Sequence, residues 1–248
     1  MKTTERHHLK DNELAIALKQ AQSWADSNSR TLIATVGAIV IVGGAVLGYM
    51  AWRNNTDNKA RAMLAEAMVI EESRVMPPGP PPGTTNDPTA TGGQAPGTYP
   101  TEQAKLEAAL PKFQAAADAY PSNEAGQMAR FHAARALVAL GRFDEAVKQY
   151  DQVIAGNSQL LSRSARLGKA EAQLRAAQYD PAIATLKQIV DQEDASLPAD
   201  AVLVELARAY RLAGKTDDAR KTLQQVVEQH ADSMYASEAK AELEKLKG

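Results

Sequence analysis

The chain has 248 residues, 28 of them basic and 30 acidic, and a pI near 6.1. This balance lacks the excess of lysine and arginine that marks a nucleic-acid-binding protein, so we expect no nucleic-acid partner. Cysteine is absent, which excludes disulfides, thiolate metal sites and cysteine nucleophiles. Aromatic residues make up only 5% and alanine is abundant, a composition that favours packed helices over sheets.

Residues 1–30 form a polar tail that carries both basic and acidic side chains. Between Asn12 and Trp24 the apolar residues recur at helical spacing, which is typical of a short amphipathic helix on a membrane surface or against a partner. A solvated, partly disordered tail is the alternative that this pattern leaves open.

Residues 31–52 carry no charge and are bounded by Arg30 and Arg53. As a helix they would extend roughly 33 Å, enough to cross a hydrocarbon core about 30 Å thick. Trp52 stands at one end, where amphipathic rings favour the membrane–water interface. We therefore predict one transmembrane helix that contacts the lipid bilayer. A buried core helix and the apolar region of a cleaved signal peptide are the alternatives.

The predicted span contains Gly44 and Gly48, a small-xxx-small pattern that lets two helix backbones approach closely in a membrane. It predicts helix–helix packing and a homo-oligomer, and a groove that only lipid fills is the alternative. Basic residues near the two ends of the span are almost equal in number, so charge alone does not fix the orientation. Because a large body behind an uncleaved anchor is usually exported, we expect the tail inside the cytoplasm and the body outside it.

Residues 53–75 carry an apolar stripe at helical spacing, which predicts a juxtamembrane helix ending near Arg74. The composition then changes sharply, because residues 76–100 hold eight of the 12 prolines and a single charge, at Asp87. Such a segment buries too little surface to offset chain entropy. We expect a disordered Pro/Gly-rich loop that acts as a spacer, with a ligand for a proline-reading domain as the alternative.

Residues 101–248 are predicted to be almost entirely helical and to repeat. Alanines at 146, 182 and 219 lie 36 and 37 residues apart, each after a turn with a small residue and four positions before a large apolar residue. Asp144 and Asp180 are predicted N-caps, and Pro181 is predicted at the first helical position. This spacing is typical of stacked helical hairpins.

A period of about 34 residues with this pattern resembles the tetratricopeptide repeat. Three repeats match, at about 127–160, 163–196 and 200–233. The motif's first-helix aromatic is missing, and the closing proline is missing as well. The aromatic positions hold Arg130, Arg166 and Leu203.

The resemblance implies an all-α fold, in which one N-terminal transmembrane helix precedes a solenoid of helical hairpins at 101–248. Residues 57–74 and 101–121 would be the two helices of an earlier repeat, split by the proline-rich loop, with Pro111 kinking the second. Residues 234–247 would form the C-terminal capping helix that covers the exposed apolar end of a solenoid.

In such a solenoid the first helices line a concave groove. Apolar residues and arginines alternate at the positions expected to face it, which would suit an extended or helical peptide with some acidic character. Surface arginines over an inter-repeat core are the alternative. The main candidates are Met128, Phe131, Arg135, Glu171, Leu174, Arg175, Val204, Arg208 and Arg211, and Val138, Ser164, Leu167, Ala201 and Leu212 complete the set.

The layout of the whole chain resembles the bacterial ancillary SecYEG translocon subunit family, the YfgM-like proteins. A short tail, one span ending in tryptophan, an alanine-rich helix and a repeat solenoid carry this resemblance. It implies an inner-membrane anchor, a cytoplasmic tail and periplasmic repeats that associate with the translocon and with periplasmic chaperones. The long proline-rich insertion departs from the family's pattern.

The sequence contains no phosphate-binding loop, metal-spaced histidine set or nucleophile motif, so we expect neither enzyme activity nor a cofactor. The four histidines are scattered, and His132 is expected to be structural or on the surface. The sequence thus predicts a membrane-anchored protein–protein interaction module, an accessory factor for protein export or envelope chaperoning. The alternatives are a scaffold for division or outer-membrane assembly, and a cytoplasm-facing receptor with reversed topology.

Overall fold

The computed structural model describes residues 15–25, 27–79, 94–191 and 198–246. The chain forms two compact units, residues 1–56 and 57–248. Within the described residues of the first unit, 15–25 are helical, and helix α2 begins at Ser29. His7 and His8 lie outside the described residues.

Helix α2 (Ser29–Glu71) is continuous where the sequence predicts two adjoining helices. Its most apolar window has a mean hydropathy of 2.2 and contains no buried residue, and by length and composition the helix could cross a membrane. Tyr49 and Trp52 lie with their ring centroids 6.0 Å apart at its end. The helix contains no proline, so its backbone hydrogen bonds continue through Arg53 as far as Glu71.

The proline-rich insertion is closed at its base by two short strands. Strand β1 (Arg74–Val75) pairs in parallel with β2 (Thr98–Tyr99), and the amide of Met76 donates to the carbonyl of Tyr99 at 2.9 Å. The predicted helix to Arg74 is therefore wrong at its end, because α2 stops at Glu71 and the next residues pair as a strand. The proline at 77 also disfavours helix just before it. Residues 80–93, the middle of the predicted disordered loop, lie outside the described residues.

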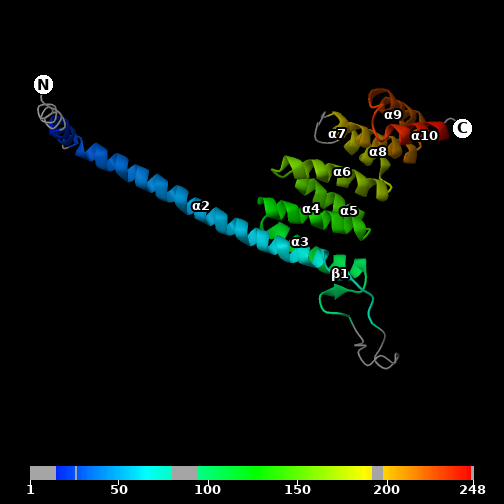
Figure 1. The fold of residues 1–248 in the computed structure, drawn as a ribbon, viewed down its shortest axis with the longest axis horizontal. Helices are drawn as coiled ribbons and strands as arrows, with labels where there is room; N and C mark the ends of the chain where they lie inside the picture. The colour runs from blue at the N-terminus through cyan, green and yellow to red at the C-terminus, as the bar shows by residue number, and fades with distance from the viewer. Residues whose placement is uncertain (1–14, 26, 80–93, 192–197, 247–248) are drawn as a thin grey trace, which may run out of the picture. The chain divides into compact units, whose positions relative to one another are not determined.

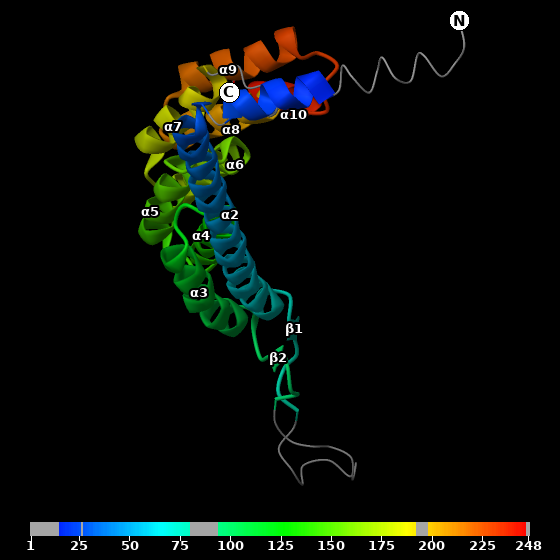
Figure 2. The same ribbon diagram turned by 90° about the vertical axis from the view of Figure 1, so that its left-hand side faces the viewer.

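The second unit is an all-α array of hairpins, in which each helix packs against its neighbours in chain order (Figures 1 and 2). The helices are α3 (Glu102–Ala119), α4 (Glu124–Ala139), α5 (Phe143–Ile154), α6 (Gln159–Arg175), α7 (Tyr179–Asp191), α8 (Ala199–Leu212), α9 (Thr216–Gln229) and α10 (Ala236–Lys245). Helices α4, α6 and α8 each begin a hairpin, and α5, α7 and α9 close it.

The last fifteen residues of α2 act as the partner of α3. Ala67 is fully buried in the same core as Phe113, and Lys112 pairs with Glu66 at 2.7 Å. His132 of α4 contacts Glu71 at 2.8 Å and stacks on the ring of Phe113. These contacts hold the split first repeat together, and they give His132 a structural position.

The cores of the hairpins are built from small residues where two helices meet. The alanines of the repeat pattern, at 133, 170, 207, 146, 182 and 219, are at most 2% exposed. Larger side chains fill the remaining space, and the bulkiest fully buried ones are Phe113, Leu137, Leu186, Val153 and Val226. Helix α3 continues past Pro111, which lies on its exposed side.

The predicted N-caps Asp144 and Asp180 are wrong by two residues. Helix α5 begins at Phe143 and α7 at Tyr179, so both carboxylates lie inside the first turn. The prediction for Pro181 is wrong by the same two residues, because it is the third residue of α7 and not the first. A left-handed residue at 141 and 177 turns the chain early enough for each helix to start before its aspartate. The carboxylates still favour the positive end of the helix dipole.

Each of these aspartates binds the turn of the following repeat. Asp144 accepts a hydrogen bond from Nε2 of Gln178 at 2.8 Å, and Asp180 accepts one from Nζ of Lys215 at 2.7 Å. Gln178 and Lys215 occupy the same position in successive turns. The contact therefore recurs from repeat to repeat and aligns neighbouring hairpins.

Arg130 occupies a position where the repeat motif usually carries an aromatic, and it is buried. Its guanidinium donates to the carbonyl of Ala117 and to Asp118, both at 3.0 Å, and to the side chains of Gln149 at 2.9 Å and Gln152. A buried charge is stable only when its hydrogen-bonding groups are satisfied in this way. The arginine thus joins α3, α4 and α5 where an aromatic ring would have filled space.

The three turns offer an internal comparison of backbone strain. Gly141, Ala177 and Gly214 have φ values of 75°, 57° and 73° at equivalent positions. Left-handed backbone costs a residue with a Cβ about 1–2 kcal/mol, whereas glycine adds about 0.4–1 kcal/mol of unfolded-state entropy. We expect Ala177→Gly to stabilise the protein by up to about 1 kcal/mol and Gly141→Ala or Gly214→Ala to destabilise it by a similar amount.

Thermal unfolding followed by circular dichroism measures this difference, which should move the melting temperature by roughly 2–4 °C in opposite directions. Equal destabilisation by all three substitutions would show that Ala177 is not strained.

Candidate partner-binding groove

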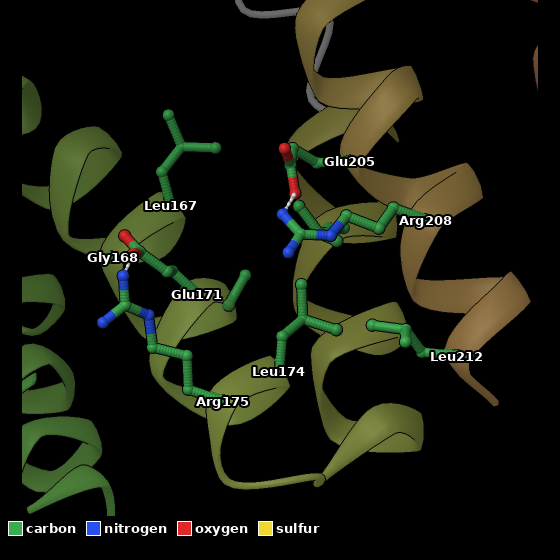
Figure 3. A pocket seen from close by; sticks show the side chains of 10 residues that line it. Leu167, Gly168, Glu171, Leu174, Arg175, Glu205, Arg208 and Leu212 are labelled. Atoms are coloured by element: carbon green, nitrogen blue, oxygen red, sulfur yellow. Dashed lines mark hydrogen bonds and ion pairs between the residues drawn. The ribbon is translucent and has the colours of Figure 1, made fainter. Parts of the chain in front are cut away.

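A pocket of about 490 Å³ opens between α6 and α8. Figure 3 shows side chains of both helices converging on it. Its floor is apolar and draws on three helices, with Leu186 supplied by α7 and the rest by α6 and α8. The apolar residues that line it are Leu167, Ala170, Leu174, Leu186 and Leu212. We call this pocket the α6–α8 groove.

Two ion pairs form the rims of the α6–α8 groove. On α6, Arg175 binds Glu171 at 2.8 Å, and on α8, Arg208 lies 3.5 Å from Glu205 (Figure 3). All four side chains are about half exposed, so each pair contributes little to stability. Each rim offsets its own charge, and the floor between the two rims is apolar.

Six of the predicted groove positions line this pocket. They lie one helical turn apart on α6 and on α8, so their side chains share one face of each helix. These residues are Leu167, Glu171, Leu174, Arg175, Arg208 and Leu212. Gly168, Ala170, Leu186 and Glu205 also line it and were not among the predicted positions. Leu186 was not predicted because it lies on α7, the second helix of its hairpin, and only the first helices were expected to line the groove.

The remaining predicted positions lie elsewhere. Val138 is only 8% exposed and belongs to the core, so its prediction as a groove residue is wrong. Met128 and Phe131 are partly buried against the same core, and Val204 packs near α10. Ser164 and Ala201 are partly exposed on their helices and do not line the α6–α8 groove.

The arginines differ in their partners. Arg211 points to the capping helix, where it lies 3.8 Å from Glu242, and Arg175 and Arg208 pair within their own helices. Arg135 on α4 is exposed and, among the described residues, has no carboxylate at ion-pair distance. Arg135 and Arg208 each follow directly after a core alanine of their repeat, so they occupy equivalent positions. Arg208 has a carboxylate close to it, whereas Arg135 has none among the described residues.

Tyr150 of α5 packs against α6 next to the groove. It was not predicted as a site residue. Its side chain is 2% exposed, and its ring packs so closely on Gly168 of α6 that a Cβ there would lie 2.4 Å from the ring. Phe131 contacts the ring edge-on at 5.9 Å. The only sequence signal was a hydroxyl at a repeat position where the other two repeats carry Leu186 and Leu223.

Burial raises the pKa of Tyr150 to about 12, and the nearby carboxylate of Glu171 acts in the same direction while Arg135 opposes it. The phenol therefore remains a hydrogen-bond donor throughout the physiological pH range. The ring contacts α4 through Phe131 and α6 through Gly168, so Tyr150 lies where these two helices approach each other.

Gly44 and Gly48 lie in the apolar part of α2, and a Cβ at either position would meet no atom within 4 Å beyond its chain neighbours and the backbone of its own helix. Their helix-packing role stays a prediction. Among the described residues there is no cluster of three or more histidine or carboxylate side chains arranged to bind a metal ion.

Comparison with known proteins identifies the repeats. Two tetratricopeptide repeat family models match the chain, one over residues 131–198 and the other over 201–233. No curated protein shows significant similarity to the chain.

Among solved structures, nearly identical TPR-like repeats assigned to a kinesin light chain of Podospora anserina align with 21% identity and a TM-score of 0.45. That alignment covers 58% of this chain and 85% of the other. MamA from Desulfovibrio magneticus RS-1 aligns with 19% identity and a TM-score of 0.43, over 58% of this chain and 86% of the other.

The environment of Tyr150 generates a pH prediction. Its pKa is raised on folding, so the stability that it contributes is complete below pH about 10, the unfolded pKa, and is lost as pH rises towards 12. We expect ultraviolet titration to show one tyrosine ionising near pH 12 that is absent from Tyr150→Phe. Unfolding free energies of the two proteins should diverge only above pH about 10. Ionisation of Tyr150 near pH 10 would contradict its burial.

Proposed function

The chain carries an array of tetratricopeptide repeats behind a long apolar helix, and we propose that it is a membrane-anchored module that binds a segment of another protein in the α6–α8 groove. Tetratricopeptide arrays are protein–protein interaction modules. The observation that carries the proposal is the open apolar floor between α6 and α8, which is large enough for one bulky side chain of a partner.

The ion pairs at the rims of the groove change the kind of partner residue that we expect to bind there. The sequence suggested that arginines would make the whole face favour acidic peptides. Because Arg175, Arg208 and Arg211 each lie next to a glutamate, their charge is already offset. The groove itself is therefore best matched by an apolar anchor with uncharged neighbours.

The long apolar part of α2 supports a membrane anchor. It is exposed along its length, and such an apolar surface is stable in hydrocarbon and unstable in water. Tyr49 and Trp52 at its end suit the interface. We propose a single-pass protein of a bacterial inner membrane, with the short tail in the cytoplasm and the repeats on the periplasmic side.

Combined with the resemblance of the layout to ancillary translocon subunits, this arrangement supports a role as an accessory factor near the export channel or the envelope chaperones. A repeat domain tethered at the membrane would hold a partner segment close to proteins that emerge there. The anchor raises the local concentration of the module, so a modest affinity in the groove would suffice.

Leu212 offers a direct test of the groove. It lines the pocket and is 39% exposed, so Leu212→Gln should leave the fold intact while weakening an apolar contact. Leu160→Gln is the matched control, because that leucine is 70% exposed and does not line the pocket. We expect Leu212→Gln to reduce partner recovery about fivefold.

The measurement is co-purification of the full chain from membranes in mild detergent, quantified by mass spectrometry. Recovery of translocon components or periplasmic chaperones with the wild type and with Leu160→Gln, but less with Leu212→Gln, supports the proposal. If neither class of protein is recovered, the export role is wrong. If the two variants behave alike, the α6–α8 groove is not the binding site.

Orientation is tested by fusing alkaline phosphatase or a fluorescent protein after Gly248. We expect active phosphatase and weak fluorescence, since phosphatase folds in the periplasm and many fluorescent proteins do not. Bright fluorescence with inactive phosphatase would place the repeats in the cytoplasm and would favour a cytoplasmic receptor or regulator instead.

A further inference from the structure

Among the described residues, the charged positions on the groove side of the repeats differ in whether they have an oppositely charged partner. Arg135, Glu171 and Arg208 occupy the same position in successive repeats, 36 and 37 residues apart, as the core alanines do. They therefore present their side chains to the same face of the array. Glu171 is offset by Arg175, and Arg208 by Glu205.

Arg135 differs from both of these residues. Its side chain is exposed, and among the described residues no carboxylate lies at ion-pair distance from its guanidinium. Its nearest helical neighbour on this face, α6, contacts α4 directly. An exposed guanidinium beside a packed wall of protein is available to a carboxylate from outside.

A hydrogen-bond donor lies beside the preceding turn of α4. The ring of Tyr150 packs on Gly168 of α6, and it contacts Phe131, which stands one helical turn before Arg135. The ring is buried and therefore fixed, which lowers the entropic cost of binding. Among the described residues its hydroxyl has no hydrogen-bond partner, and the hydroxyl oxygen is not fully enclosed. A guanidinium and a phenol together match the two oxygens of a carboxylate.

We propose that Arg135 and Tyr150 bind an acidic side chain of the partner, while an apolar side chain of the same segment fills the α6–α8 groove. This inference rests on the proposed function, because it assumes that the groove holds a protein segment. It adds the chemistry of a second contact and the spacing between the two.

The spacing follows from the packing of the helices. The acidic subsite lies at the α4–α6 contact and the apolar subsite lies between α6 and α8, so the bound segment must cross α6. Packed helices lie about 8–10 Å apart, and an extended chain advances about 3.3 Å per residue. The acidic and the apolar residue should therefore be about three positions apart in an extended segment.

The test uses the full chain in lipid nanodiscs and a phage-displayed library of random dodecapeptides. Enriched peptides are synthesised with a fluorophore, and their affinities are measured by fluorescence anisotropy. We expect sequences with aspartate or glutamate about three positions from a bulky apolar residue. Weakening by Leu212→Gln, but not by Leu160→Gln, identifies the peptides that occupy the groove.

A double-mutant cycle then isolates the acidic contact. Arg135→Ala should weaken the best peptide about fivefold, and so should replacing its acidic residue by the corresponding amide. The two changes together should weaken binding no more than either alone. Tyr150→Phe should cost about twofold to threefold. Arg142→Ala is the matched control, because Arg142 is an exposed arginine in the same repeat that pairs with Glu145 on the turn.

The outcomes separate the two proposals. Peptides that depend on Leu212 but carry no acidic residue, or a cycle in which the two effects simply add, would overturn the Arg135 subsite and leave the groove in place. Peptides indifferent to Leu212, or no enrichment at all, would count against the groove and the subsite together. An equal loss with Arg142→Ala would show a general charge effect and would also overturn the subsite.

Discussion

The close approach of helix backbones at alanine is the constraint on which the rest of this structure depends. Alanines at equivalent positions of each hairpin are almost completely buried, and any larger side chain there would force two helices apart. With so few aromatic residues, the array gains stability from many short contacts between neighbouring helices, and not from one large core. The same closeness brings the turn of one repeat within hydrogen-bonding reach of the aspartate of the preceding repeat.

The groove is a place where that closeness is relaxed. Helices α4 and α6 touch, whereas α6 and α8 leave room for the pocket over Leu186. Gly168 lies between the close packing of α6 on its α4 side and the pocket on its α8 side. On one side of α6 it admits the ring of Tyr150 against the backbone, and on the other side the helix faces the pocket. The proposed binding groove thus lies where the helices of a regular array pack less closely.

Periodicity in the sequence predicted the all-α hairpin array and most of the residues that line the pocket, because helical spacing is a local property. The partners of the arginines were not predictable in the same way. Arg175 and Glu171 are four residues apart, but whether they pair with each other or face a ligand depends on the rotamers and neighbours of the folded chain. The buried network of Arg130 joins three helices, so no local pattern reveals it. Tyr150 was treated as one of several large apolar residues, and only the folded structure shows its ring packed between Phe131 of α4 and Gly168 of α6.

The paired strands at the base of the proline-rich insertion have a consequence for how the chain tolerates change. Strands β1 and β2 hold the two ends of the insertion next to each other. The distance between the ends of α2 and α3 is therefore set by the strands and does not depend on the length of the segment between them. The entropic cost of closing a flexible loop rises by only about 0.6 kcal/mol for each doubling of its length. Insertions or deletions between the strands should therefore accumulate among relatives without disturbing the register of α2 and α3, and the length of this segment should vary more freely than that of any turn in the array.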